Sequence, residues 1–354
     1  MPDDAIMRPS AVARLAAAAG LILTVLAATA ARGDWTMRDP WPAPEETSGV
    51  EATDVRFPSS SPFTPVSIGK AEPATAVGRL YLPPGSSGLP PRSVPAVVML
   101  HGSGGVLSAR ELTYGPQLAA MGIAALAIDS FAARREKGTG FTERLLNITE
   151  SMVLADAYAA LAFLAQRPEI DPARVVLVGF SYGGMSTMYA LSAGIAERLS
   201  PGGLRFAGHV AYYAPCIARF EDVRTTGAPL LMLYGEKDEL IDPARCAAVA
   251  EDFRRGGSEV RIISYPEAVH QWDGAFGLRP IGRLLNPCRF VVEKDGTVRD
   301  ERTRLAMTGP ITRRISLFLC IKDKPYMIGA DPAVRAQSNR DLGAFLSHIF
   351  ERKG

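Results

Sequence analysis

Residue types that carry metal or nucleic-acid chemistry are scarce in this chain of 354 residues. It holds four histidines and four cysteines, and their spacing matches no zinc site. Basic and acidic residues are nearly balanced, at 39 and 37, and the basic ones form no stripe along the sequence. No repeat of about 20 to 50 residues is visible, so nothing indicates a solenoid. We therefore expect no cofactor, no metal and no nucleic-acid partner.

A long apolar run occurs near the start of the chain, at residues 15–31. Arg8 and Arg14 precede this run, and the small residues at 28–30 match the pattern that signal peptidase recognises. We expect residues 1–30 to be a cleaved signal peptide and the protein to be secreted or periplasmic, with no stable membrane partner. The run is also near the lower length limit for crossing a bilayer, so a membrane anchor at residues 15–31 is the alternative.

Apolar segments of strand length alternate with helical patterns from residue 96 to residue 265. The predicted strands cover residues 96–100, 123–128, 175–178, 206–213, 229–234 and 260–265, and the predicted helices cover 112–121, 148–165, 185–195 and 243–253. Strands that are apolar throughout are typical of a parallel sheet covered on both faces. No linker interrupts the alternation, so residues 31–354 are expected to form one α/β domain with a core at about 76–270.

The segments on either side of this core are less regular. Strands are expected at residues 50–57 and 76–82. Residues 271–327 are too long for a simple connection and read as an insertion, in which Asp295-Gly296 marks a hairpin. A last helix at residues 331–350 follows.

Four cysteines in an exported protein favour disulfides, and they allow three pairings. We favour Cys216–Cys246, because Cys216 follows one predicted strand and Cys246 lies in the helix after the next strand. Cys288 and Cys320 flank the predicted hairpin, and a bond between them would brace an insertion that has little core of its own. Four buried free thiols are the alternative.

The segment Gly179–Gly183 (GFSYG) matches the G-x-S-x-G pattern of a nucleophile elbow. Such an elbow is a tight turn between a strand and a helix that exposes the serine, and small flanking residues are needed to avoid collisions. The context agrees, since a predicted strand precedes the turn and a predicted helix follows it. Ser181 is therefore the candidate nucleophile, and a glycine-rich turn with a spectator serine is the alternative.

A serine nucleophile needs a base and a carboxylate that orients the base. His270 follows the sixth predicted strand, whereas His209 lies inside an apolar strand and is expected to be a hydrogen-bonded core residue. Asp238 follows the fifth predicted strand, and the order Ser181, Asp238, His270 is typical of hydrolases with this type of elbow. Three other carboxylates of that loop compete with Asp238 for this role and fit others better: Glu236 and Glu239 as solvated charges and Asp242 as a helix cap.

The segment His101–Gly105 (HGSGG) follows the first core strand and frees backbone N–H groups to meet an oxyanion. We assign one donor to the backbone of Tyr182 and the second to Ser103 or Gly102. A phosphate-binding loop is the alternative, but the Lys-Ser/Thr of a P-loop and the G-x-G-x-x-G spacing are both missing.

The segments His101–Gly105, Asp129–Phe131, Gly179–Gly184 and Gly235–Asp238, together with His270, resemble the dienelactone hydrolase family. The resemblance covers about residues 76–270 and the last helix. It implies an α/β-hydrolase fold, here with a disulfide-pinned insertion, and hydrolysis of esters or lactones of small carboxylic acids. Dienelactone hydrolases proper carry cysteine at the elbow, whereas this chain has serine, so dienelactone itself is in doubt as the substrate.

The sequence thus predicts a serine hydrolase that forms an acyl-enzyme on Ser181 with a small-molecule ester or lactone. One alternative is a serine peptidase of the prolyl-oligopeptidase type, although the chain has too few residues before its first core strand for the large extra domain of such enzymes. The other is an inactive hydrolase-fold binding protein. Labelling by a fluorophosphonate separates enzymes from a binding protein.

Overall fold

The computed structural model describes residues 35–352, so the expected signal peptide or anchor lies outside the described residues. The strands are β1 Ala52–Ser60, β2 Pro73–Tyr81, β3 Val94–Leu100, β4 Ala124–Ile128, β5 Ile170–Phe180, β6 Gly208–Tyr212, β7 Ala218–Phe220, β8 Leu230–Gly235, β9 Val260–Tyr265, β10 Arg279–Ile281, β11 Phe290–Val292, β12 Val298–Asp300 and β13 Tyr326–Ile328. The α-helices are α1 Glu111–Ala120, α2 Phe141–Asn147, α3 Glu150–Ala165, α4 Tyr182–Tyr189, α5 Ala193–Leu199, α6 Pro243–Arg255, α7 Pro310–Cys320 and α8 Pro332–Glu351. Short 3-10 helices are η1 Pro44–Thr47, η2 Pro65–Ser67, η3 Ser86–Gly88 and η4 Ala132–Lys137.

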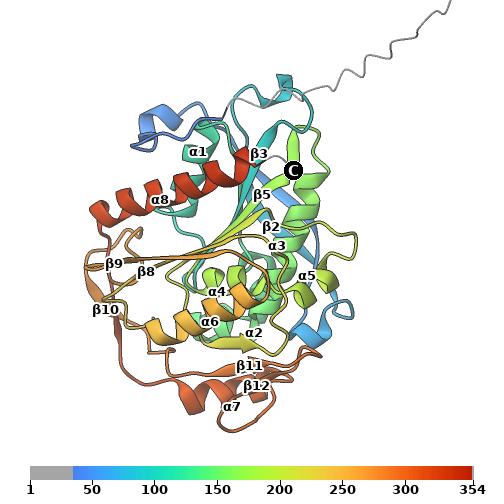
Figure 1. The fold of residues 1–354 in the computed structure, drawn as a ribbon, viewed down its shortest axis with the longest axis vertical. Coiled ribbons are helices and arrows are strands. Elements are labelled where there is room, and N and C mark those ends of the chain that lie inside the picture. Colours follow the sequence, from blue (N-terminus) through green and yellow to red (C-terminus); the bar gives the residue numbers. More distant parts are fainter. Residues whose placement is uncertain (1–34, 353–354) are drawn as a thin grey trace, which may run out of the picture. The chain divides into compact units, whose positions relative to one another are not determined.

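The main sheet has eight strands in the order β1-β2-β4-β3-β5-β6-β8-β9 (Figure 1). The six strands from β4 to β9 in this order are parallel, β2 pairs antiparallel with β4, and β1 pairs antiparallel with β2. The parallel sheet covered by helices is the predicted α/β-hydrolase architecture. The sheet begins at Ala52, earlier than the expected core boundary at residue 76, because β1 pairs with β2 along its whole length.

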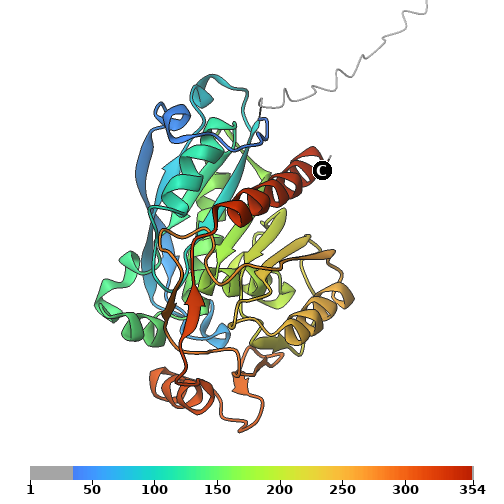
Figure 2. The ribbon, with the colours of Figure 1, turned by 90° about the vertical axis from the view of Figure 1, so that its left-hand side faces the viewer.

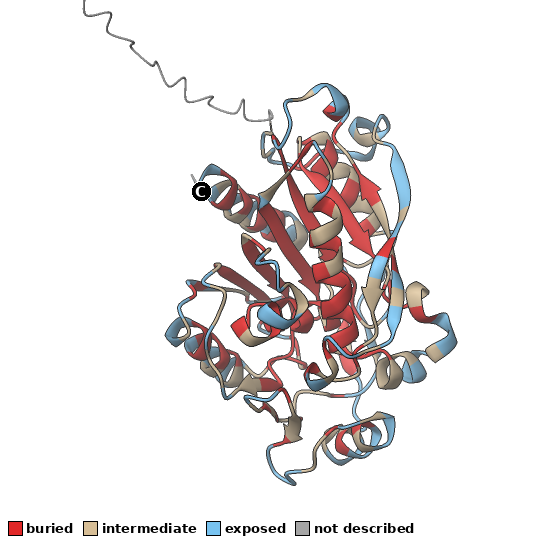
Figure 3. Ribbon diagram, turned by 90° about the vertical axis from the view of Figure 1, so that its right-hand side faces the viewer, coloured by how far each residue is buried: buried red, intermediate tan, exposed pale blue. Residues whose placement is uncertain are grey.

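Both faces of the sheet are buried at its centre, where every residue of the apolar strand β3 is buried. Val97 and Met99 pack in the same cluster as residues of α1 and α8, whereas Ala96, Val98 and Leu100 pack with residues of α3, α4, α5 and α6. Alternate side chains of a strand point to opposite faces, so a sheet between two helical layers needs apolar residues at every position. Figure 3 shows the central strands of the main sheet as a buried layer between the helices.

The chain order within the sheet changes direction at β3. From β3 the chain first moves to β4 on one side, and from β5 onward it builds the other side. Loops at the carboxyl ends of strands beside such a switch point form the usual ligand site of an open α/β sheet. The segment after β3 (His101–Gly105) and the segment after β5 (Ser181) therefore meet at this point.

The single helix predicted at residues 185–195 is wrong, because the structure has two helices there. α4 ends at Tyr189 and α5 begins at Ala193. Between them the chain turns away to hydrogen-bond with the segment 224–226: Thr226 N–H donates to Leu191 O, and Ala193 N–H donates to the carbonyl of Arg224. The break thus coincides with a long-range contact, and Ser192 occupies the N-cap position of α5.

The insertion is attached to the core by a small sheet and carries a helix that the sequence analysis did not predict. The expected hairpin forms between β11 and β12, and β11 also pairs in parallel with β7, which follows β6 (Figure 2). Helix α7 follows the hairpin, with Pro310 at its first turn. Trp272 and Asp273 are fully buried, so the excursion leaves the core only after these residues.

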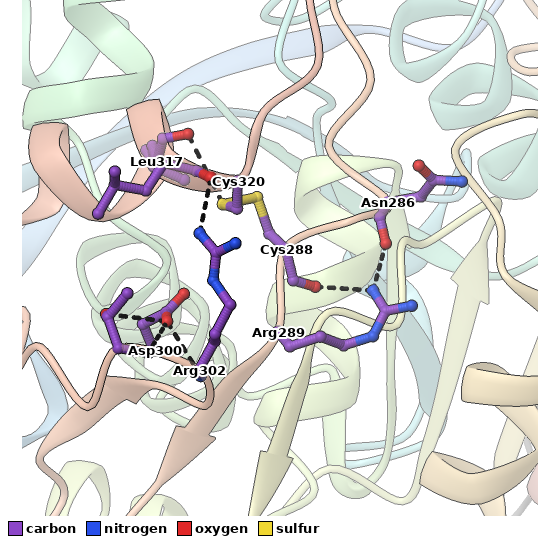
Figure 4. The surroundings of a disulfide bond; sticks show 9 residues. Asn286, Cys288, Arg289, Asp300, Arg302, Leu317 and Cys320 are labelled. Carbon is purple, nitrogen blue, oxygen red and sulfur yellow. Dashed lines mark hydrogen bonds between the residues drawn. A yellow bond between two sulfur atoms is a disulfide. The ribbon is translucent and has the colours of Figure 1, made fainter.

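The structure contains the two disulfides that the sequence analysis favoured. Cys216 is bonded to Cys246, which joins the segment after β6 to α6. Cys288 is bonded to Cys320, which joins the start of the hairpin to the end of α7 (Figure 4). The residues around the second disulfide also hydrogen-bond one another, since Arg289 donates to the carbonyl of Cys288.

In the described part of the chain, no helix taken alone has the length and hydropathy to cross a membrane. The bent pair α2 and α3 reaches the length and apolar composition of a membrane span only when the two helices are counted together.

Candidate active site

Ser181 occupies a strained position between β5 and α4. Its backbone angles are φ 52° and ψ −108°, a region that residues with a side chain rarely adopt. Its N–H donates to the carbonyl of Tyr212 on the neighbouring strand β6, at 2.9 Å. The strand and the helix that flank Ser181 therefore hold this turn, and the hydroxyl faces the carboxyl edge of the sheet.

Glycines beside Ser181 make the tight turn possible. A Cβ atom on Gly179 would lie 2.2 Å from the carbonyl oxygen of Gly183, and one on Gly183 would lie 2.3 Å from the carbonyl oxygen of Leu100. Both distances are far shorter than a carbon–oxygen contact allows. The pattern G-x-S-x-G is thus required here by the close approach of α4 to β3 and β5.

His270 lies between Ser181 and Asp238 and reaches both. Its Nε2 is 2.9 Å from Ser181 Oγ, and its Nδ1 is 2.7 Å from Asp238 Oδ2. In a neutral imidazole, Nδ1–H donates to the carboxylate and Nε2 accepts from the serine hydroxyl. His270 and Asp238 are both buried and shielded from water, whereas Ser181 is partly exposed and lines a cavity.

Asp238 is oriented by its own loop as well as by His270. Its Oδ1 accepts a hydrogen bond of 2.9 Å from the N–H of Leu240, which fixes the plane of the carboxylate. The other carboxylates of this segment have different partners: Glu236 accepts from Ser264, Glu239 pairs with Lys324, and Asp242 accepts from the N–H of Arg245 at the start of α6. Among these four carboxylates, only Asp238 contacts the imidazole.

Two tyrosine rings hold the imidazole of His270 from its sides. The ring centroid of Tyr213 lies 4.7 Å from that of His270, and the centroid of Tyr326 lies 5.5 Å away. Tyr213 follows β6 directly, whereas Tyr326 comes from β13 at the end of the insertion. The position of Tyr213 after a core strand was a usable sequence signal that our prediction missed. Nothing in the sequence pointed to Tyr326.

A buried network of charged groups supports Tyr213 from behind. Its hydroxyl donates to Asp273 at 2.6 Å and accepts from Arg110 at 3.2 Å, and Arg110 pairs with Glu111. Burial raises the pKa of Asp273, against the opposing effects of Arg110 and the Tyr213 hydroxyl. Burial alone would lower the pKa of Arg110, but Glu111 and the other neighbours hold it above its ordinary value. The network fixes the ring that packs against His270.

The glycine segment after β3 lies close to Ser181. A Cβ atom on Gly102 would lie 3.5 Å from the Cβ of Ser181, and the N–H of Gly105 donates to the carbonyl of Gly102 to close the turn. Tyr182 is the first residue of α4, and the first N–H groups of a helix have no acceptor within the helix. Ser103 and Tyr182 line the same cavity as Ser181. Two of the expected oxyanion donors, Ser103 and Tyr182, therefore lie beside the candidate nucleophile Ser181.

The other three histidines are not part of this arrangement. Nδ1 of His101 lies 2.7 Å from the carbonyl of Gly102, and His348 is exposed on α8. His209 is fully buried, but neither ring nitrogen has a hydrogen-bond partner among the described residues. The expectation of a hydrogen-bonded core residue is therefore wrong, because strand β6 places the ring among apolar side chains. Burial lowers the pKa of His209 to about 3.

A cavity of about 790 Å³ opens at Ser181. Its walls come from α4, from the region of β7 and from the insertion, including β11 and α7. The insertion thus forms one side of the site. Among the described residues no group of three or more His, Cys, Asp or Glu side chains is placed to hold a metal ion.

Comparison with known proteins identifies the family. The model of the dienelactone hydrolase family matches residues 84–274, more than half of the chain. A Methylorubrum extorquens protein named as a carboxymethylenebutenolidase is 27% identical over 163 residues, which cover 44% of this chain and only 55% of that protein. A Bradyrhizobium protein named as a 2-oxo-3-(5-oxofuran-2-ylidene)propanoate lactonase is 27% identical over 174 residues, which cover 46% of this chain and 68% of that protein.

A solved structure shares the fold. The crystal structure of a dienelactone hydrolase-like promiscuous phosphotriesterase from metagenomic libraries is 18% identical, with a TM-score of 0.51. The match covers 84% of this chain and 98% of that one. The family match and this common fold agree with the nucleophile-elbow geometry described above. This chain therefore belongs to the dienelactone hydrolase family and has the α/β-hydrolase fold.

Proposed function

We propose that this protein is a serine hydrolase that cleaves carboxylic esters or lactones through an acyl-enzyme on Ser181. The observation that carries the proposal is the position of His270, which is hydrogen-bonded to Ser181 on one side and to Asp238 on the other. A serine is a poor nucleophile until a neighbouring base takes its proton, and a carboxylate on the far side of the imidazole stabilises the cation that results.

The reaction has two halves. Ser181 Oγ attacks the ester carbonyl while its proton moves to Nε2 of His270, and the tetrahedral oxyanion accepts hydrogen bonds from the N–H of Tyr182 and that of Ser103 or Gly102. His270 then gives the proton to the leaving alkoxide as the carbon–oxygen bond breaks. In the second half His270 takes a proton from water as the water oxygen attacks the acyl carbonyl, and it then returns that proton to Ser181 Oγ as the bond to the serine breaks and the acid is released.

The comparisons support the substrate class of the proposal. The family is one of hydrolases, and two relatives carry names of enzymes that open lactone rings. A lactone is a cyclic ester, so the same attack on its carbonyl opens the ring and leaves the alcohol attached to the product. The substrate is accordingly a small molecule.

The proposal extends to the organisation and location of the protein. Residues 31–354 form a single hydrolase domain that is exported after removal of residues 1–30. In support, the described residues from Trp35 onward fall within one compact unit. The two disulfides are compatible with an oxidising compartment such as the periplasm.

The replacement Ser181→Ala tests the proposed function. It should lower kcat/KM for p-nitrophenyl esters by on the order of 10⁴–10⁶-fold, because loss of the nucleophile removes the covalent route. A fluorophosphonate should label the wild-type protein and not the variant. Full activity in a clean Ser181→Ala preparation would contradict the proposal, and cleavage of peptides in preference to esters would favour a peptidase.

A further inference from the structure

The cavity at Ser181 extends well beyond the reacting atoms. Met185 and Tyr189 line it from one face of α4, four residues apart, and Ser181 lines it from the position just before that helix. Eight positions along a helix correspond to about 12 Å. The volume of about 790 Å³ is in the range that holds a drug-sized ligand, and it exceeds what a single small lactone ring fills.

The walls opposite α4 are also apolar and come largely from outside the core sheet. Ala218 and Phe220 of β7 line the cavity, and Phe220 packs against Tyr189 at a centroid distance of 5.6 Å. Phe290 of β11 and Leu317 of α7 complete this side. The small sheet and the helix of the insertion therefore form a wall that an apolar chain can contact along its length.

Four of the five charged groups that line the cavity form two ion pairs with one another. Arg313 donates to both oxygens of Glu150, at 2.9 and 3.0 Å, and also to the carbonyl of Leu145. Arg283 pairs with Asp323 at 3.1 Å. Because Arg313 is buried and four of its five N–H groups already donate to Glu150 and Leu145, its charge is balanced within the protein and is not offered to a substrate carboxylate. Arg314 also lines the cavity, but it lies on the exposed side of α7.

We infer that the natural substrate is an uncharged ester or lactone with one extended apolar chain, which lies along α4 between Ser181 and Tyr189. This inference rests on the proposed function and specifies its substrate. A path of about 12 Å fits a chain of roughly nine carbons, at about 1.3 Å of advance for each carbon–carbon bond of about 1.5 Å. The acid or alcohol is therefore larger than the small acids that the family resemblance implies.

Chain-length series measure this preference in the wild-type enzyme. One series consists of p-nitrophenyl esters from acetyl to decanoyl, and the second consists of acetates of alcohols from ethyl to decyl. Each buried methylene contributes up to about fourfold, so kcat/KM should rise by at least about 100-fold along one series. A second expected result is that an octanoyl ester with a terminal carboxylate reacts at least about tenfold more slowly than octanoate itself.

The variant Ala218→Phe tests whether the cavity causes the preference. The added ring occupies the space beside Phe220, so the ratio of kcat/KM for the eight-carbon and two-carbon substrates should fall at least about tenfold. This ratio does not depend on how much of the preparation is folded. The matched control is Ile311→Phe, because Ile311 lies on α7, is 77% exposed and is absent from the cavity wall. The control should keep the wild-type ratio.

Flat or falling activity along both series would overturn the inference, as would a preference for the carboxylate-bearing ester or an unchanged ratio in Ala218→Phe. Failure of the proposed function has a different signature. In that case no ester of either series is cleaved faster by the wild type than by Ser181→Ala.

Discussion

Asp238 differs from the carboxylates around it in burial and in contact with His270. It is 3% exposed and accepts from both His270 and the N–H of Leu240, whereas Glu236 is exposed and accepts from Ser264. A buried carboxylate stabilises the imidazolium that forms during catalysis and keeps the neutral ring in the useful tautomer. A solvated carboxylate in the same loop has neither effect.

We predict that Asp238→Asn lowers kcat by on the order of 10³–10⁴-fold, because an amide can hold the imidazole in the wrong tautomer. Steady-state hydrolysis of a p-nitrophenyl ester measures the loss. Glu236→Gln is the matched control and should keep activity within about twofold, since its side chain lies at the surface. A large loss in Glu236→Gln with little loss in Asp238→Asn would reverse the assignment of the acid.

His209 has a measurable effect on stability at acid pH. Its pKa is lowered from 6.5 to about 3 by burial, so between these values the unfolded chain binds a proton that the folded protein does not. Stability should therefore fall as the pH drops below 6.5, by up to about 1.4 kcal/mol per pH unit from this residue. His209→Phe should remove this part of the slope in denaturant unfolding followed from pH 7 to pH 4.

The exposed His348 provides the control for that measurement. His348→Gln should leave the pH slope of the unfolding free energy as it is in the wild type. An equal slope in wild type and His209→Phe would show that the buried ring takes up a proton in the folded protein.

At the level of elements, the apolar strands and their connecting helices were predictable because their signals are local. Buried parallel strands are apolar at every position, and Asp242 and Asp331 cap α6 and α8 as their positions before Pro243 and Pro332 indicated. β7, by contrast, is three residues long and pairs with β11, whose residues lie 290 − 218 = 72 positions further on. Such a strand depends on a distant partner, so its own sequence could not reveal it.

The Cys288–Cys320 bond links the two elements of the insertion that line the cavity. The double variant Cys288→Ser, Cys320→Ser should lower the free energy of unfolding by about 3 to 4 kcal/mol, since the disulfide closes a loop with a separation of 32 residues. Denaturant unfolding measures this change. Peptide mapping of the wild type without reductant should recover Cys216 with Cys246 and Cys288 with Cys320. Four free thiols in protein purified from an oxidising compartment would contradict the pairing. They would also remove the disulfides as support for export.

At the level of the whole molecule, the order of motifs along the chain was enough to predict that Ser181, Asp238 and His270 meet. Each follows a strand of one parallel sheet, and the carboxyl ends of such strands share an edge. The groups that surround them were not predictable in this way. Arg110 and Asp273 are both hydrogen-bonded to the hydroxyl of Tyr213, although the three residues are far apart in the sequence. One side of the cavity wall is formed by an insertion whose packing no local sequence pattern describes.

Trapping of the acyl-enzyme tests the central claim most directly. The enzyme is mixed with excess p-nitrophenyl octanoate, quenched in acid during turnover and digested for peptide mass spectrometry. We predict that the octanoyl group is found on the peptide that contains Ser181, and that none is found in the Ser181→Ala variant treated in the same way. An octanoyl group on another residue, or hydrolysis at the wild-type rate in Ser181→Ala, would contradict the assignment of Ser181 as the nucleophile.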